Sequence, residues 1–408
     1  MANEIILLNI SGQDKPGLTS ELTSILAAYD AKILDIGQAN IHNTLSLGIL
    51  FEVQSGKKSG AVLKDLLFKS YELDIQAKFT PISLKNYENW VNLQGKDRYI
   101  VTILGEKFGA KQISEVTKVI SEKKLNIDSI KRLTGRLSLV KNDEYPRACI
   151  QLSIRGEINN KAEITERFMK ISHDLDVDIA FQEDNIYRRN RRLVCFDMDS
   201  TLIQAEVIDL LAELAGVGDE VKKITESAMN GEIDFKESFK KRMQLLKGLS
   251  EEVLHNVAVN LPITKGARRL IDTLKNYGYK TAILSGGFTY FGKYLQKELG
   301  IDYVYANQLE IKDGMLTGGY LGEIVDGNKK AEYLREIAIK EGIDIGQTIA
   351  VGDGANDLAM LNIAGLGIAF HAKPKVKDNA QSSISSIGLD GVLYLLGYHD
   401  RHIDLIAR

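Results

Sequence analysis

The first 184 residues of this 408-residue chain carry an internal repeat, and this repeat limits the folds that the chain can adopt. Residues 5–10 predict a buried strand, a turn follows at Asp14-Lys15-Pro16-Gly17, and the predicted elements continue in the order βαββαβ. The same order recurs over residues 99–181. We therefore expect two split-βαβ, ferredoxin-like domains, at residues 1–85 and 86–184. Because that fold hosts many unrelated functions, it predicts no chemistry by itself.

The pattern changes after Arg192 to short apolar strands that alternate with longer helical segments. This alternation is typical of an α/β domain with a doubly wound parallel sheet, which we place at residues 185–408. Between the first two strands, residues 206–260 show helical periodicity and no strand pattern, so we expect a helical cap there. The expected strands of the sheet are 193–196, 281–284, 303–306, 348–351 and 367–370.

Charge excludes two classes of partner. The formal net charge is −3 and the pI is about 6.2, so the chain has no basic field for nucleic acid or for an anionic membrane. The one cationic cluster is formed by Arg188, Arg189, Arg191 and Arg192. We interpret it as a solvated linker, because the charges are few and a strand pattern follows directly.

The sequence also bears on the cellular compartment. No apolar stretch approaches the ~20 residues that a membrane span needs, and the first residues lack the basic start and apolar core of a signal peptide. Cys149 and Cys195 both lie in apolar runs, which predicts two buried thiols and no disulfide framework. We therefore expect a cytoplasmic protein.

Two carboxylates follow the first strand of the predicted parallel sheet. Asp197 and Asp199 stand two positions apart, a spacing that places side chains on one face of an extended chain. Open α/β sheets bind ligands beyond the carboxyl ends of their strands, so both acids are expected to point into one crevice. The simpler interpretation is a helix cap, but a cap needs only one acid.

Three further polar segments stand at or near strand ends. Ser285-Gly286-Gly287 offers a hydroxyl and backbone N–H groups for phosphate oxygens, although such a turn is common. Gly352-Asp353-Gly354-Ala355-Asn356-Asp357 offers oxygen ligands for a hard cation, or alternatively a capped turn. Lys329-Lys330 lies between them in the sequence, where one lysine would neutralise a phosphoryl group or both would simply be solvated.

In chain order, these four segments resemble the haloacid dehalogenase superfamily of phosphotransferases, over about residues 185–408. The motifs Asp-Met-Asp-Ser-Thr-Leu and Gly-Asp-Gly-Ala-Asn-Asp carry the resemblance. It implies that Asp197 is the nucleophile that attacks phosphorus, and that Asp199 protonates the leaving oxygen and later activates water. It also implies Mg²⁺ at the Asp197 carboxylate, the Asp199 carbonyl and Asp353, with Asp357 in support.

The same resemblance implies the residues that hold the substrate. Ser285, Gly286 and Lys330 would bind the phosphoryl group, and Asn356 would position the phosphate and water; Lys330 is preferred to Lys329 by its distance from Glu341-Gly342-Ile343. Within the cap, the residues that match substrate-contacting positions are Glu206 for an amino group, Arg242 for a carboxylate, and Met229 and Phe235 for apolar closure. Without the resemblance, Glu206 would be a helix-start acid and Arg242 an exposed cation.

The resemblance, with these contacts, implies hydrolysis of O-phospho-L-serine to L-serine and phosphate, the last step of serine synthesis. Two alternatives stay open. The enzyme would act on another small phosphate ester such as phosphohomoserine if the contacts of Glu206 and Arg242 differ. The chain would be an amino-acid sensor with an inert catalytic domain if the charged residues at the strand ends do not act.

The N-terminal repeat resembles a pair of ACT domains, the small-molecule-binding modules attached to many amino-acid enzymes. Asp14-Lys15-Pro16-Gly17-Leu18 fits the ACT turn that faces a ligand, whereas Glu106-Lys107-Phe108-Gly109-Ala110 departs from it and has no proline. The resemblance implies serine or another amino acid as an effector. It also implies a homodimer, because ACT domains commonly pair side by side.

Overall fold

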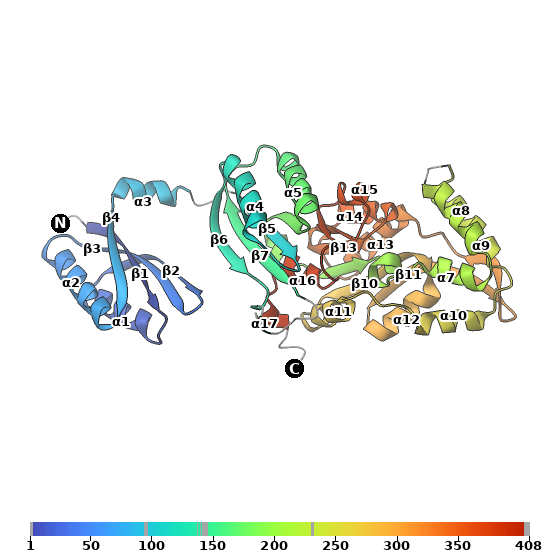
Figure 1. Cartoon of the computed structure of the whole chain (residues 1–408), viewed down its shortest axis with the longest axis horizontal. Helices are drawn as coiled ribbons and strands as arrows, with labels where there is room; N and C mark the ends of the chain where they lie inside the picture. The colour runs from blue at the N-terminus through green and yellow to red at the C-terminus, as the bar shows by residue number, and fades with distance from the viewer. Residues whose placement is uncertain are drawn as a thin grey trace. The chain divides into compact units, whose positions relative to one another are not determined.

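The computed structural model describes residues 3–93, 97–136, 138, 140, 146–229 and 232–403, and not the side chains of Lys57 and Met229. The chain divides into two compact units, residues 1–96 and 97–408, which are described separately (Figure 1). Within the described residues, no helix is both long and apolar enough to cross a bilayer.

The first unit is an antiparallel sheet with strand order β2-β3-β1-β4 and two helices on one face. Gly17 begins α1 with φ 92°, a conformation that glycine adopts without strain. Leu18, Leu22 and Leu26 then recur at helical spacing and are buried against the sheet. The elements are β1 (Asn3–Gln13), α1 (Leu18–Ala28), β2 (Lys32–Ile41), β3 (Thr44–Gln54), α2 (Lys57–Glu72), β4 (Ile75–Ile82) and α3 (Leu84–Val91).

The second unit begins with the second copy of this fold, with strand order β6-β7-β5-β8. Its elements are β5 (Arg98–Gly105), α4 (Ala110–Glu122), β6 (Asn126–Arg132), β7 (Ala148–Arg155), α5 (Lys161–Leu175) and β8 (Asp178–Glu183). Two βαββαβ domains were expected from the repeat, and this part of the fold prediction is confirmed.

The C-terminal domain is built on a seven-stranded sheet with order β12-β11-β10-β9-β13-β14-β15. The strands are β9 (Leu193–Phe196), β10 (Lys280–Phe288), β11 (Tyr303–Lys312), β12 (Met315–Leu321), β13 (Thr348–Gly352), β14 (Leu366–Phe370) and β15 (Ser382–Ile384). Five of these strands were expected. The structure adds the three-residue β15 and the edge strand β12, which pairs antiparallel to β11, so the sheet is mostly but not wholly parallel.

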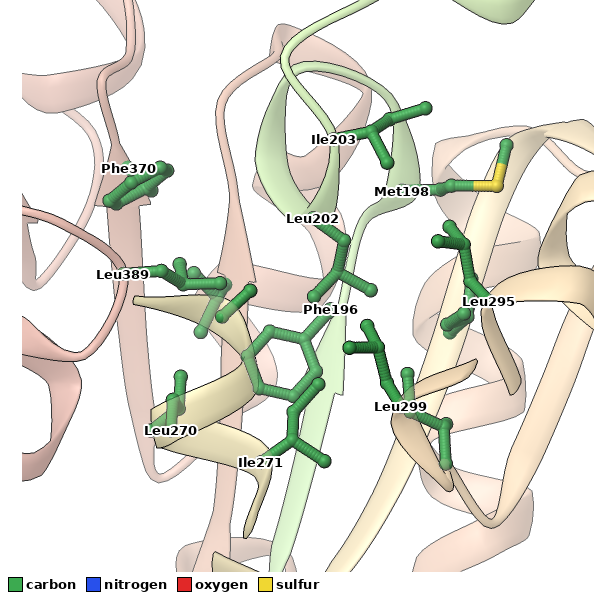
Figure 2. Packing of buried hydrophobic residues seen from close by; sticks show 14 of the residues in the cluster. Phe196, Met198, Leu202, Ile203, Leu270, Ile271, Leu295, Leu299, Phe370 and Leu389 are labelled. Carbon is green, nitrogen blue, oxygen red and sulfur yellow. The ribbon is translucent and has the colours of Figure 1, made fainter. Parts of the chain in front are cut away.

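Helices cover both faces of this sheet, as expected for a doubly wound domain. Residues of β9 alternate between the faces: Val194 and Phe196 pack toward α11 (Ala267–Asn276) and α12 (Thr289–Leu299), and Leu193 and Cys195 pack toward α13 (Gly327–Lys340) and α14 (Leu358–Ile363). Figure 2 shows the Phe196 ring among apolar side chains of the first face. The remaining short helices are α6 (Ile186–Arg189), α15 (Pro374–Lys377), α16 (Gly391–Leu395) and α17 (Asp400–Ile403).

The segment expected to be a cap is helical. It contains α7 (Val207–Leu214), α8 (Gly218–Met229), α9 (Phe235–Leu245) and α10 (Glu251–Val259), which gather at one end of the C-terminal domain in Figure 1.

The second βαββαβ domain shares a core with the C-terminal domain. The sheet face that α4 and α5 leave open carries Leu104, Cys149 and Ala180, which belong to the same buried cluster as Val392 and Leu393. The interface also includes polar contacts, because the Asp178 carboxylate accepts hydrogen bonds from the Ser385 and Ser386 backbone N–H groups (2.8 to 2.9 Å) and from the Ser386 hydroxyl (2.6 Å). These two domains therefore form one packed body.

The interpretation of the arginine cluster as a solvated linker was wrong for two of its members. Arg189 and Arg192 are exposed, but Arg188 and Arg191 are 8% and 5% exposed. The two packed domains bury these side chains between them, and the periodicity of the sequence does not predict burial by a neighbouring domain. Both cysteines are buried and free, as expected.

Candidate active site

Asp197 begins the site at the carboxyl end of the central strand β9. Its backbone N–H donates to the Val351 carbonyl of β13 (2.8 Å), so the chain is still aligned with the sheet at this point. Ser200 then turns the chain with φ 56°. The Asp199 carboxylate accepts the Val207 N–H (3.0 Å) at the start of α7, which ties it to the first cap helix.

Lys330 joins this strand end to the one at β13. Its Nζ lies 2.8 Å from an Asp197 oxygen and 2.7 Å from an Asp357 oxygen, and its side chain is completely buried. Asp357 also accepts the Gly354 N–H (2.9 Å), and Asp353 accepts the Thr201 hydroxyl (3.2 Å). The neighbouring lysine points elsewhere.

Lys329, the alternative to Lys330, forms ion pairs with Glu323 (3.0 Å) and Glu332 (2.8 Å). Among the described residues, it makes no ion pair with Asp197, Asp353 or Asp357. The structure therefore places Lys330, and not Lys329, beside the predicted nucleophile.

Burial dominates the electrostatics of the carboxylates. It raises the pKa of Asp197 well above its usual value, and the nearby Asp357 charge raises it further. Burial and the Glu206 charge raise the pKa of Asp199 to about 8, and burial and the Asp357 charge raise that of Asp353 to about 7. One lysine therefore faces more negative charge than it can neutralise.

The unbalanced charge fits a divalent cation. Carboxylate oxygens of Asp197, Asp353 and Asp357 all lie within 4.8 Å of one another. An all-oxygen set is the kind that Mg²⁺ prefers. The Asp199 carboxylate lies outside this group. Only the Asp199 backbone carbonyl, the atom that the resemblance implied, is therefore left as a ligand for the cation.

Residues 285–287, where the pairing of β10 with β11 is irregular, form a bulge that comes close to the two acids. The Ser285 hydroxyl, which is fully buried, accepts the Gly287 N–H (2.9 Å). A Cβ at Gly287 would lie 2.5 Å from an Asp199 oxygen, so a side chain there would displace the acid. Ser285 and Gly286 were predicted to bind phosphate, and the structure brings this bulge of β10 to the Asp199 side of the site.

Asn307 is a site residue that sequence reasoning missed. Its side-chain amide donates to the carbonyls of Gly286 (2.7 Å) and Gly287 (3.3 Å), and its oxygen accepts the Val325 N–H (2.8 Å). It therefore holds the bulge of β10 against the segment that leads into α13. The available signal was a polar residue directly after the apolar run 303–306.

The cap residues Glu206 and Arg242 lie close to the same acids. Glu206 accepts the Ser200 hydroxyl (2.7 Å), and desolvation of its carboxylate raises its pKa. Burial lowers the pKa of Arg242, while the charges of Asp209, Glu206 and Asp199 oppose that shift. Its Nε has no hydrogen-bond partner among the described residues. Glu206 is the exposed N-cap residue of α7, which agrees with its simpler interpretation, whereas Arg242 is half-buried and is not the exposed cation that its simpler interpretation required.

The remaining predicted contacts differ in how far the structure describes them. The Phe235 ring tip lies 3.0 Å from the position of a Cβ at Gly286, so this cap residue touches the bulge of β10. The Asn356 side chain contacts Gly354, within the loop after β13. The Met229 side chain lies outside the described residues.

Comparisons with known proteins agree with this geometry. A haloacid dehalogenase-like hydrolase model matches residues 194–362, and ACT domain models match residues 4–80 and 98–182. A phosphoserine phosphatase of Streptomyces coelicolor is 40% identical over 395 residues, covering 96% of this chain and 92% of that protein. One from Mycobacterium tuberculosis is 36% identical over 392 residues, covering 96% and 93%.

Solved structures extend the comparison to the fold. A probable phosphoserine phosphatase from Vibrio cholerae, in unliganded form, has a TM-score of 0.58 and 35% identity, covering 76% of this chain and 88% of its own. A hydrolase of the same superfamily from Salmonella enterica has a TM-score of 0.64 and 29% identity, covering 73% and 98%. Because a full-length relative is 40% identical to it, this chain belongs to the phosphoserine phosphatases, haloacid dehalogenase-like hydrolases, and carries two ACT domains ahead of the catalytic domain.

Proposed function

We propose that this chain hydrolyses O-phospho-L-serine to L-serine and phosphate through an aspartyl-phosphate on Asp197, as the last step of L-serine synthesis. The observation that carries the proposal is the buried Asp197 carboxylate, held 2.8 Å from the Lys330 ammonium beside two further acids. A carboxylate nucleophile divides hydrolysis into two easier steps.

In the first step an Asp197 oxygen attacks phosphorus, and the bond from phosphorus to the seryl oxygen breaks. Asp199 donates a proton to that leaving oxygen. A carboxyl whose pKa is raised to about 8 holds a proton at neutral pH, as a general acid requires. In the second step Asp199 accepts a proton from water, whose oxygen attacks phosphorus and releases phosphate and the free Asp197 carboxylate.

The phosphoryl group gathers negative charge on its oxygens in the transition state, so cations and N–H donors facing it lower the barrier. We assign this role to Lys330, the Ser285 hydroxyl and the Gly286 N–H, with Asn356 positioning phosphate and water. Mg²⁺ would be held by the Asp197 carboxylate, the Asp199 carbonyl and Asp353, with Asp357 in support. When bound, it supplies positive charge to the phosphoryl oxygens.

Substrate choice is assigned to the cap. Glu206 would accept the substrate ammonium and Arg242 the carboxylate, with Met229 and Phe235 closing over them. The two polar residues lie near Asp199, because the Glu206 charge raises the pKa of Asp199 and the Asp199 charge acts on Arg242 in turn. A substrate that covered them would strengthen such charged contacts, because water would then compete less for them.

The domain and assembly assignments complete the proposal. We place the boundaries of the ACT domains at 1–85 and 86–184 and of the phosphatase domain at 185–408, with a cap at about 206–260. Serine or another amino acid would act as effector at the ACT domains of a cytoplasmic homodimer. The model matches at 4–80 and 98–182 support the presence of both ACT domains and leave the effector open.

The test is phosphate release by the purified chain from L-phosphoserine, with Mg²⁺ or with EDTA, beside phosphohomoserine and p-nitrophenyl phosphate. We expect metal-dependent release that is selective for phosphoserine, and none from Asp197→Asn. Arg242→Ala should lose that selectivity while it retains activity on the aryl phosphate. Preference for another ester would leave the proposed reaction unchanged but assign a different substrate. Full activity of Asp197→Asn would refute the assignment of Asp197 as the nucleophile.

A further inference from the structure

The arginine cluster of the linker remains outside the catalytic site, and its two buried members have different surroundings. Arg188 lies within 3.9 Å of the Asp184 carboxylate. Arg191 makes no ion pair with any acid in the described part of the chain, and its Nη1 donates only to the carbonyls of Thr348 (3.3 Å) and Gly346 (3.5 Å). Arg191 is therefore a buried cation without a carboxylate partner.

A buried guanidinium without a counter-charge destabilises the structure that contains it. Desolvation, with a smaller effect of the Arg188 charge, lowers the pKa of Arg191 to about 10. An anion that reached Arg191 would reverse part of this cost, so the side chain favours an anionic ligand.

Arg191 lines a cleft of about 1130 Å³ between the second ACT domain and the phosphatase domain. One wall comes from α5 and β8 and carries Glu166, Lys170 and Gln182; the other includes Asp378 and the start of β14. Both walls belong to one packed body, because Asp178 and the shared apolar cluster hold the two domains together.

The cleft is separate from the sites discussed above. Arg191 precedes the amino end of β9, whereas the catalytic acids follow its carboxyl end. The cleft and the active site therefore lie at opposite ends of the parallel strands. The cleft also has no residue of the ACT turns at 14–18 and 106–110. A ligand bound in it would touch neither.

The walls carry charges of both signs. Lys161 and Glu183 pair with each other (3.0 Å), which leaves Lys170 and Arg191 against Glu166 and Asp378 without an ion pair among the described residues. Such a lining matches a small molecule with one anionic and one cationic group. We propose that this cleft binds a free α-amino acid, with its carboxylate at Arg191 and its ammonium at Glu166 and Asp378.

Binding is tested on the full chain by calorimetry with L-serine, glycine, L-aspartate and L-lysine. The measurements use Arg242→Ala as the background, so that the active site contributes little to binding. We expect at least one of these amino acids to bind, and Arg191→Met to weaken it about tenfold or more, equivalent to about 1.4 kcal/mol. The adjacent exposed Arg192→Met is the matched control and should bind like the background.

A second variant covers the case in which Arg191→Met fails to fold. Glu166 and Asp378 are exposed, so Glu166→Gln with Asp378→Asn should fold normally and bind the amino acid about tenfold more weakly. A carboxylic acid with the same side chain but no amino group should bind this double variant as tightly as it binds the Arg242→Ala background.

Three outcomes would overturn the proposal: no binding of any of the four amino acids, equal affinity of the Arg191 variant and the background, or loss of binding in Asp14→Asn alone. Because the readout is binding, its failure is distinct from a failure of the proposed reaction.

Discussion

Replacing Lys330 by Met removes the only cation that the structure places between Asp197 and Asp357 within its described residues. Each contact, at 2.8 and 2.7 Å, is an attraction on the order of 6 kcal/mol at an effective dielectric constant of about 20. Desolvation offsets most of this attraction. Removal of one partner of a buried pair nevertheless costs about 3–5 kcal/mol, because the remaining charges stay buried and unpaired.

The same change should slow catalysis. Loss of one preorganised cation or donor facing a developing negative charge costs about 10²–10³ in kcat. Phosphate release from L-phosphoserine measures the rate, and urea unfolding without divalent cations measures the stability. Saturating Mg²⁺ should recover part of the stability of Lys330→Met, because a cation at the acids replaces some of the lost positive charge, and should not restore the rate.

Lys329→Met is the matched control for this prediction. Lys329 is the next residue along α13, pairs with Glu323 and Glu332, and should tolerate the same substitution with little change in rate. If Lys330→Met kept kcat/KM within threefold of the unmodified chain, or if Lys329→Met were the slower of the two, the assignment of the phosphoryl-binding lysine would be wrong.

Two further predictions concern the cap and the domain interface. Desolvation raises the pKa of Glu206, so this carboxylate becomes neutral as the pH falls through a value above its usual range. The KM for phosphoserine should rise over that pH range, because the neutral carboxyl no longer attracts the substrate ammonium. The KM of the Glu206→Gln variant, measured over the same pH series, should not change. Asp178→Asn weakens the acceptor for the Ser385 and Ser386 N–H groups, and should lower the free energy of unfolding by about 1–3 kcal/mol in urea titrations of the full chain. An unchanged free energy would mean that water replaces the carboxylate as acceptor.

The sequence predicted the parts of the fold that depend on local periodicity. The repeat predicted both βαββαβ domains, and short apolar runs predicted the five inner strands, of which β9, β13 and β14 are buried at every residue. β12 was missed because Thr317-Gly318-Gly319-Tyr320 lacks a strand pattern, and β15 because it is three residues long. Both are edge strands that pairing with a neighbour defines.

The site was predictable where spacing along one segment determines it. Asp197 and Asp199 share one strand end, and Gly352 to Asp357 share one loop, so short motifs were sufficient to find them. Asn307 and Asp178 escaped because their partners lie 18 to 21 and 207 to 208 positions away, and only tertiary contact brings those together. Arg191 was misread for the same reason, because a domain packed across the linker buries it.

The two ACT domains should differ in their ability to fold alone. The first is a compact unit by itself, with its apolar cluster between sheet and helices. The second contributes Leu104, Leu133, Cys149 and Ala180 to the core of the phosphatase domain, and would expose them as a separate fragment. Each fully buried leucine exposed to water costs about 1.5–3 kcal/mol, which is a large share of the 5–15 kcal/mol that stabilises a domain.

We therefore expect fragment 1–93 to unfold cooperatively on heating, and fragment 97–184 to aggregate or to lack a cooperative transition. Circular dichroism melts of both fragments measure the difference. Replacing Leu104 and Leu133 by Gln should improve the solubility of the second fragment but destabilise the full chain, because the same side chains are exposed in one and buried in the other. A cooperative transition of unmodified 97–184 at the temperature of the full chain would show that the shared core contributes little, and the second ACT domain would then be independent of the enzyme that follows it.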